Sequence, residues 1–173
     1  MDTLVQYTIP IKGLGPGVHE FDFHIDNDFF THFENSPIQE GDLQLHLVFD
    51  KRADLFVLEF DFQGTVKADC DRCLAKIDLP IGNQQRLLVK FSLEEELEEA
   101  EVIYIHPEAQ KLNVSKYIYE YICLAMPMIK VYDCDQEENR PCNEEMLGYL
   151  DNEEEENTDS NPIWDELKKL NKE

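Results

Sequence analysis

The chain has 173 residues and an apolar fraction of 42%, enough to build one folded domain with a hydrophobic core. Its charge is unusual, because 38 acidic residues stand against 15 Lys and Arg and give a formal net charge of −23. Proteins that bind nucleic acid directly gain affinity from basic residues that neutralise phosphates, so this balance excludes an extensive phosphate-binding face. The surface suits a basic protein, a cation or an RNA coated with basic protein, or it serves solubility alone.

The first residues of the chain carry neither the basic nor the apolar run of a signal peptide. No apolar run approaches the ~20 residues that a membrane helix needs. We therefore expect a cytoplasmic protein that does not enter a membrane. In that reducing compartment, paired cysteines indicate a metal or redox site rather than structural disulfides.

Strand patterns fill the first half of the chain. Residues 4–14 are rich in β-branched and aromatic side chains, and residues 18–25 alternate apolar with polar. The stretches 43–49 and 56–62 alternate in the same way around a short polar connection, which predicts a hairpin whose second strand continues towards Cys70. Further strands are predicted at 74–79, 87–91 and 102–105, and a short helix at 27–33.

The order of these elements predicts an α+β fold. Successive strands without long helices between them favour a mainly antiparallel sheet that is curled or barrel-like. After Asn113, a candidate N-cap, apolar side chains from 114 to 125 recur at helical spacing. This α-helix should pack on the open face of the sheet and end before Pro127. A zinc-stapled C-terminal region and a short terminal helix complete the predicted fold.

Composition divides the chain into three parts. Residues 1–150 are predicted to form a single β-rich domain that contains the cysteine cluster, and the acidic linker 151–161 should be disordered by itself. Residues 162–173 read as a short amphipathic helix that starts at Pro162. Its apolar side chains Trp164, Leu167 and Leu170 are candidate partner-binding residues. The alternative, which we favour, is that this helix docks back on the domain.

Four cysteines in two pairs are the candidate metal ligands. Cys70 and Cys73 form a Cys-x-x-Cys turn, which places two thiolates at a separation that suits one tetrahedral Zn²⁺ ion. Cys134 and Cys142 have a looser spacing and supply the second pair. Basic residues near both pairs would offset the charge of the thiolates: Lys67, Arg72, Lys76 and Arg140. We predict a structural zinc ion; the alternatives are that only the first pair matters or that all four are ordinary cysteines.

Catalytic chemistry has little support in this sequence. A thioredoxin-like redox role needs its cysteines at a helix N-terminus after a parallel strand, whereas Cys70 and Cys73 are predicted to lie between antiparallel strands. The five histidines form no recognised spacing with a Ser or Cys nucleophile, and no glycine-rich nucleotide-binding motif is present. We therefore expect the chain to bind rather than to catalyse.

The motifs, taken in order, resemble those of the bacterial YceD family, the large ribosomal RNA subunit accumulation proteins. The resemblance rests on the Cys-x-x-Cys-Leu box at 70–74, the helix end at 121–127 with a cysteine pair after it, and residues 162–167. That last stretch is similar to the family's closing Asp-Pro-Arg-Trp-x-x-Leu segment, with Asn161 in place of Asp and Ile163 in place of Arg. Only Cys134 and Cys142 match the family's richer C-terminal cysteine cluster.

The resemblance implies a cytoplasmic, non-enzymatic role in large-subunit ribosomal RNA accumulation or ribosome assembly. Together with the charge, it predicts an acidic scaffold that holds a basic ribosomal protein or its site on a pre-ribosomal particle. The alternative is a protein-interaction or chaperone-like module unrelated to ribosomes, which engages a groove through the helix around Trp164.

Overall fold

The computed structural model describes residues 3–93, 98–99, 102–132 and 141–156. The chain divides into two units. The first comprises residues 1–68 and 78–128, and the second comprises residues 69–77 and 129–173. No helix in the described ranges is both long enough and apolar enough to cross a membrane.

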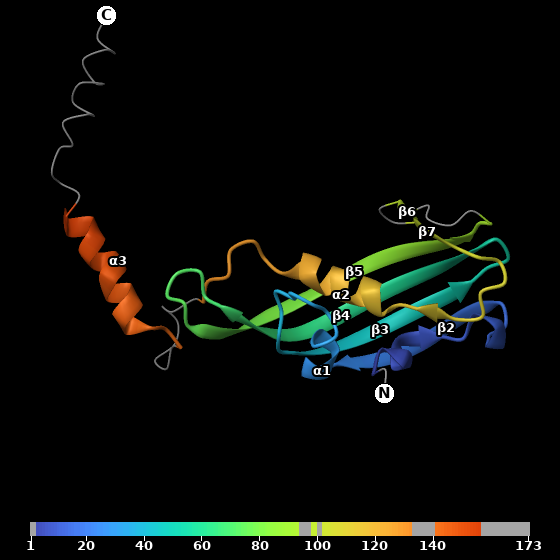
Figure 1. Cartoon of the computed structure of the whole chain (residues 1–173), viewed down its shortest axis with the longest axis horizontal. Coiled ribbons are helices and arrows are strands. Elements are labelled where there is room, and N and C mark those ends of the chain that lie inside the picture. Colours follow the sequence, from blue (N-terminus) through green and yellow to red (C-terminus); the bar gives the residue numbers. More distant parts are fainter. Residues whose placement is uncertain (1–2, 94–97, 100–101, 133–140, 157–173) are drawn as a thin grey trace, which may run out of the picture. The chain divides into compact units, whose positions relative to one another are not determined.

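A six-stranded sheet dominates the structure (Figure 1). Its strands lie in the order β2 (Gly17–Ile25), β3 (Gly41–Lys51), β4 (Leu55–Asp69), β5 (Lys76–Phe91), β7 (Val102–Ile105) and β6 (Glu98–Glu99). The pairs β2–β3, β3–β4 and β6–β7 are antiparallel. The pair β5–β7 is parallel, with Val102 opposite Leu88 and Ile105 opposite Phe91.

The α+β class and the mainly antiparallel sheet are therefore confirmed, but the barrel-like closure is wrong. The strand order has two ends, β2 and β6, so the sheet among the described residues is open. A closed sheet would need its first and last strands to pair. The predicted hairpin is confirmed, with β3 and β4 joined in the register Leu47↔Phe60.

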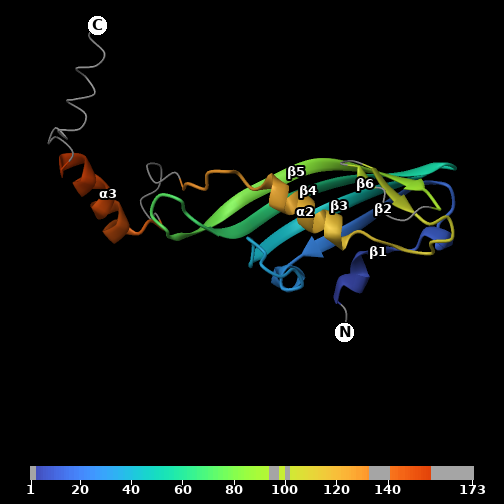
Figure 2. The same cartoon turned by 45° about the horizontal axis from the view of Figure 1, so that its top comes forward.

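The alternating pattern of the strands gives the sheet one buried and one exposed face. On the buried face lie the side chains of Leu43, Leu45, Leu47 and Phe49 from β3 and of Phe56, Leu58, Phe60 and Phe62 from β4. The helix α2 (Ser115–Ala125) crosses this face (Figures 1 and 2). The Phe60 and Tyr121 rings meet edge to face at 5.2 Å between centroids. The predicted packed helix is confirmed, and Met126 is extended before Pro127.

The strand predicted at residues 4–14 is largely wrong. This segment forms the 3-10 helices η1 (Thr3–Tyr7) and η2 (Ile11–Gly13), separated by the short strand β1 (Thr8–Ile9). Pro10 follows β1 directly and has no N–H to continue a ladder. β1 pairs with β8 (Leu112–Asn113) in the register Ile9↔Leu112, which lays the buried Ile9 beside the entry to α2.

Two predicted strands at 74–79 and 87–91 are one long strand, β5, that runs through Pro80. β7 pairs with β5 only over Leu88–Phe91, so Pro80 lies where the described sheet has β4 as its single neighbour. A proline is tolerated on such a free edge because no ladder bond needs its missing N–H.

Two further helices flank these strands in sequence. α1 (Asn27–Phe30) is capped by Asp26, whose carboxylate accepts from the Phe29 N–H at 3.3 Å. α3 (Glu144–Glu156) was not predicted, and it includes residues 151–156 of the expected linker. Its sequence is mainly acidic with few apolar residues, so hydrophobic periodicity gave no signal for it.

Candidate functional site

The exposed face of β2, β3 and β4, here termed the outer face, carries most of the acidic side chains of these strands. Its carboxylates include Glu20 and Asp22 on β2, Asp42 and Asp50 on β3, and Glu59 and Asp61 on β4. Successive residues of a strand point to opposite faces of the sheet. The apolar residues that alternate with these acids face the core, so the acidic side chains face solvent. β2 and β3 contribute no Lys or Arg to this face and β4 contributes Lys67, so acidic side chains outnumber basic ones on the three strands.

Strand register brings Asp22, His46 and Asp61 into one row across three strands. Asp22 lies opposite His46, and His46 lies opposite Asp61. His46 Nδ1 is 2.8 Å from Asp22 Oδ1, and Gln84 Nε2 donates to Asp61 Oδ2 at 2.8 Å. The hydrogen bond to Asp22 raises the pKa of the exposed His46 imidazole, and the charges of Asp22, Glu20 and Asp61 add to this effect.

Two shallow hollows meet at this row. One is lined by Asp22, Gln44, His46, Asp61 and Gln63, and the other by His46, Val48, Glu59, Asp61, Gln84 and Arg86, among others. Both are open and are lined by polar and apolar surface, which suits a peptide side chain better than a deeply enclosed small molecule.

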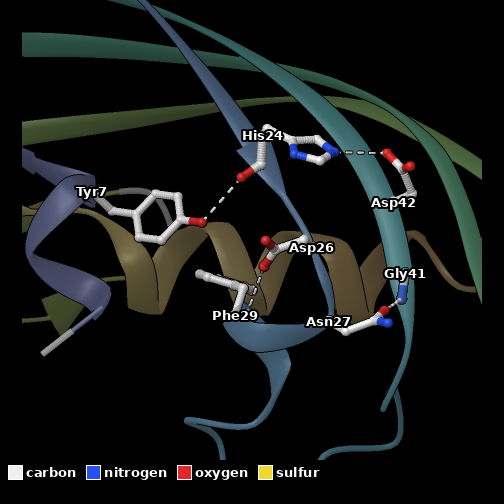
Figure 3. Close-up of polar contacts among 7 residues, drawn as sticks. All are labelled: Tyr7, His24, Asp26, Asn27, Phe29, Gly41 and Asp42. Carbon is white, nitrogen blue, oxygen red and sulfur yellow. Dashed lines mark hydrogen bonds and ion pairs between the residues drawn. The ribbon is translucent and has the colours of Figure 1, made fainter. Parts of the chain in front are cut away.

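A third hollow lies where β2 ends and β3 begins (Figure 3). Its carboxylates are Asp26, Asp28, Glu40, Asp42 and Asp78. Several have structural partners: Asp42 Oδ1 lies 2.9 Å from His24 Nε2, and Asp78 Oδ1 lies 2.7 Å from Lys67 Nζ. Nearby, Asn27 Oδ1 accepts from the Gly41 N–H at 2.8 Å and ties α1 to the start of β3.

These carboxylates are suited to pairing with basic side chains. Within residues 3–93, 98–99, 102–132 and 141–156, no group of three or more His, Cys, Asp or Glu side chains is arranged to hold a metal. Spaced carboxylates on a strand surface can each pair with a Lys or Arg of a partner.

The turn between β4 and β5 contains the first cysteine pair. Cys70 and Cys73 are free thiols, each 1% exposed. The Cys70 N–H donates to the Ala75 carbonyl at 2.8 Å, and the Leu74 N–H donates to the Cys70 carbonyl at 2.9 Å. Leu74 adopts a left-handed conformation with φ of 58°, which reverses the chain within a few residues.

Asp71 ties this turn to the segment after α2. Its backbone N–H donates to the Lys130 carbonyl at 2.7 Å, and its carboxylate accepts from the Lys130 N–H at 2.7 Å. Lys130 Nζ lies 3.2 Å from the same carboxylate. These contacts hold the pKa of Asp71 below its usual value, and they fix the loop that carries both thiols.

The surroundings of Cys70 favour its ionised form. Burial opposes ionisation of Cys70, but backbone donors of Tyr132, Cys73 and Arg72 outweigh burial and lower the pKa of the Cys70 thiol. In zinc sites, backbone N–H groups that donate to a metal-bound sulfur stabilise the thiolate in the same way. Two of the expected basic neighbours are paired with carboxylates: Lys67 with Asp78, and Lys76 with Asp69 at 3.0 Å.

The remaining predicted site residues are only partly covered by the structure. Cys142 lies just before α3 and is disulfide-bonded. Cys134, Arg140, Trp164, Leu167 and Leu170 lie outside the described residues, so the four-cysteine site and the partner-binding helix stay predictions.

Sequence reasoning missed the acidic row on the outer face. The sequence showed only that the histidines form no recognised catalytic spacing, and it predicted no pairing of His46 with Asp22. The alternation of acids with apolar residues was visible in each strand. Only the register between strands, however, shows that Asp22 and Asp61 flank one imidazole.

Comparison with protein families gives a match that covers most of the chain. Residues 58–171 match the family model described as large ribosomal RNA subunit accumulation protein YceD. Comparison with curated proteins and with solved structures gave no match. The matched range includes the Cys-x-x-Cys turn, α2 and the segment around Trp164. The chain therefore belongs to the YceD family, whose name indicates a role in the accumulation of the large ribosomal RNA subunit.

Proposed function

We propose that the protein is a non-enzymatic factor in large-subunit ribosomal RNA accumulation that works as an acidic binding scaffold. Its partner is a basic ribosomal protein, free or on a pre-ribosomal particle. The membership of the family supports the ribosomal part of this proposal. The chain acts by holding its partner rather than by chemistry on it.

The observation that carries the scaffold proposal is the outer face. Glu20, Asp22, Asp42, Glu59 and Asp61 are exposed on adjacent strands whose positions are fixed by long antiparallel ladders. Ribosomal proteins must be basic to neutralise RNA phosphates, so they are attracted to such a face before they reach the RNA. A rigid sheet keeps the carboxylates apart from one another, which lets each pair with a different basic side chain.

Capture from a cell lysate tests the scaffold proposal. We expect the wild-type chain to retain ribosomal proteins or precursor particles at low salt and to release most of them at moderate salt, because exposed charges are screened. The double variant Glu59→Gln/Asp61→Asn should retain several-fold less. The control Asp54→Asn/Glu108→Gln removes the same charge from exposed positions away from the outer face and should behave as wild type. Equal capture by both variants, or no ribosomal material with wild type, overturns the proposal.

We include a structural zinc ion in the proposed function. Cys70 and Cys73 would supply two thiolates from the turn, and Cys134 and Cys142 the other two. Support comes from the two buried free thiols and the lowered pKa of Cys70. A sulfur in a disulfide is not a thiolate ligand, so the four-cysteine site requires Cys142 in reduced form.

Metal analysis of untagged protein purified under reducing conditions tests the zinc site. We expect about one zinc per chain, with fewer titratable thiols before chelation than after it. The variant Cys70→Ser should lose the metal, whereas Cys123→Ser, which changes the cysteine in α2, should keep it. A chain that is fully folded with no bound metal and a full set of reactive thiols would contradict the zinc proposal and leave the scaffold proposal standing.

A further inference from the structure

The edge of β2 that faces away from β3 exposes backbone N–H donors and C=O acceptors. β2 stands at one end of the strand order and pairs only with β3 in the described sheet. The Tyr7 hydroxyl donates to the His24 carbonyl at 3.2 Å, from the side opposite β3 (Figure 3). In an antiparallel strand, alternate residues direct their N–H and C=O groups to the same side. Val18, Glu20 and Asp22 therefore point theirs away from β3.

In the part of the chain that the structure describes, these three residues make no backbone hydrogen bond outside the ladder with β3. Their side chains are exposed, 61% for Val18 and 85% for the Asp22 side chain. Proteins usually blunt or cover such an edge, because it is a template for another strand. Tyr7 closes the edge at His24 and leaves the three preceding outward positions open.

Charge decides between the possible occupants of this edge. β2 contains Glu20 and Asp22 and no Lys or Arg. A second copy of β2 would place these carboxylates beside the same residues of its partner, and like charges on neighbouring strands are destabilising. Nucleic acid brings phosphates and is repelled in the same way. A strand with basic side chains is attracted.

We propose that the edge of β2 binds a basic, extended segment of a partner protein by β-strand addition. This inference rests on the proposed scaffold function and names the way in which the partner is held. β2 precedes the residues that match the family model, so the inference concerns this chain's own N-terminal part.

The geometry also specifies the sequence pattern of the added strand. Residues opposite Glu20 and Asp22 share their face of the sheet, so they should be Lys or Arg. The residues between them fall on the other face beside Phe21 and Phe23, which are half-buried, so they should be apolar. Alternating basic and apolar residues therefore fit this edge.

Two N-methylated peptides test backbone pairing without changing the protein. The probe is a capped peptide of alternating Lys and Val, measured by calorimetry at low salt. The Lys N–H groups face β2 in the added strand and the Val N–H groups face away. We expect N-methylation of the Lys residues to weaken binding at least tenfold and N-methylation of the Val residues to change it little. Equal affinity of the two peptides, which have the same charge and mass, would overturn the proposal.

A variant pair tests the same edge from the protein's side. Glu20→Gln removes one charge, whereas Glu20→Pro also removes an N–H that the β2–β3 ladder does not use. We expect a loss of a few-fold for Glu20→Gln and at least tenfold for Glu20→Pro. Hydrogen exchange at the amides of Val18, Glu20 and Asp22 should slow in the wild-type complex. If exchange there stays unchanged on saturation with the peptide, strand addition is wrong.

Two outcomes separate this inference from the scaffold proposal. In the first outcome, Glu20→Pro captures ribosomal proteins as well as wild type does, and the two N-methylated peptides bind with equal affinity. That result would overturn strand addition and leave the scaffold proposal standing. In the second outcome, the wild-type chain sediments as a dimer and Glu20→Pro sediments as a monomer. That result would assign the edge of β2 to a second copy of the chain and overturn the proposal of a basic partner.

Discussion

Gly64 on β4 is a position where the backbone leaves no room for a side chain. It lies opposite Leu43 in the β3–β4 register. A Cβ added there would collide with the Asp42 carbonyl oxygen and lie 2.6 Å from the Leu43 Cα. Backbone atoms of a central strand cannot shift as a flexible side chain does, so the strands would have to separate.

Gly64→Ala should therefore destabilise the sheet. We expect a loss of about 1–3 kcal/mol in the free energy of unfolding, the usual cost of overpacking. Gly15→Ala is the control, because a Cβ at that position meets nothing within 4 Å. Urea denaturation followed by circular dichroism measures both variants. Equal midpoints for the two would show that β3 and β4 tolerate the extra carbon.

A second prediction at the residue scale concerns the Asp22–His46 pair. The hydrogen bond raises the pKa of His46 above its usual 6.5, so the charged pair favours the folded state below that pH. This contribution is lost as the pH rises through the raised pKa. Asp22→Asn should lower the pKa of His46 towards 6.5, as NMR titration of the imidazole would show. An unchanged titration midpoint, with Asp54→Asn as reference, would contradict this.

At the scale of elements, α2 is attached to the sheet through one apolar stripe. Val114, Ile118 and Ile122 are at most 2% exposed, whereas Leu124 on the same helix is 73% exposed. Tyr121 on this helix packs against Phe60 of β4, and Tyr119 stacks on Phe33, so the apolar side of α2 faces the core. The polar side of α2 contributes an ion-pair contact at 4.0 Å between Lys116 and Glu120, which adds little.

Ile122→Ala should cost about 2–5 kcal/mol of unfolding free energy, because it leaves a cavity beneath the helix. Leu124→Ala removes a side chain of similar size from the exposed side and should cost less than 1 kcal/mol. Thermal unfolding of both variants measures the difference. Similar losses would mean that α2 is not anchored through its apolar stripe.

Periodicity predicted the elements whose pattern is set by burial. The strands β2, β3 and β4 and the helix α2 each have one buried side, so apolar residues mark their length and type. The strand prediction failed over most of residues 4–14 because apolar side chains such as Tyr7 and Ile11 are buried from 3-10 turns rather than from a strand. The sequence wrongly predicted a break in the strand at Pro80. Proline is accepted on a free strand edge, and only the strand order shows that Pro80 lies on one.

The candidate site was predictable to a smaller extent. The Cys70–Cys73 turn followed from spacing alone, since two cysteines three positions apart share one loop. The outer face required strand register, which depends on pairing between residues far apart in sequence. Asp71 was not singled out, because its bonds to Lys130 join segments that no local pattern connects.

At the scale of the whole molecule, the sole tryptophan offers a direct test of the terminal segment. Trp164 is the only Trp in the chain, so intrinsic tryptophan fluorescence reports on this residue alone. If the helix predicted at 162–173 docks back, its emission should be blue-shifted and protected from acrylamide, and deletion of these residues should lower Tm. Emission like that of a free peptide would favour the alternative, in which Trp164, Leu167 and Leu170 are held out for a partner.

The β1–β8 ribbon has a consequence for biosynthesis. It joins Thr8 to Asn113, which are 105 positions apart. At ordinary translation rates, roughly 5–20 s pass between the emergence of these two residues from the exit tunnel. During that interval Tyr7 and Ile9 lack the core into which they pack, so the nascent chain exposes these apolar side chains. Chaperones that bind nascent chains should therefore bind the segment around Tyr7 and Ile9 and release it once α2 has been synthesised.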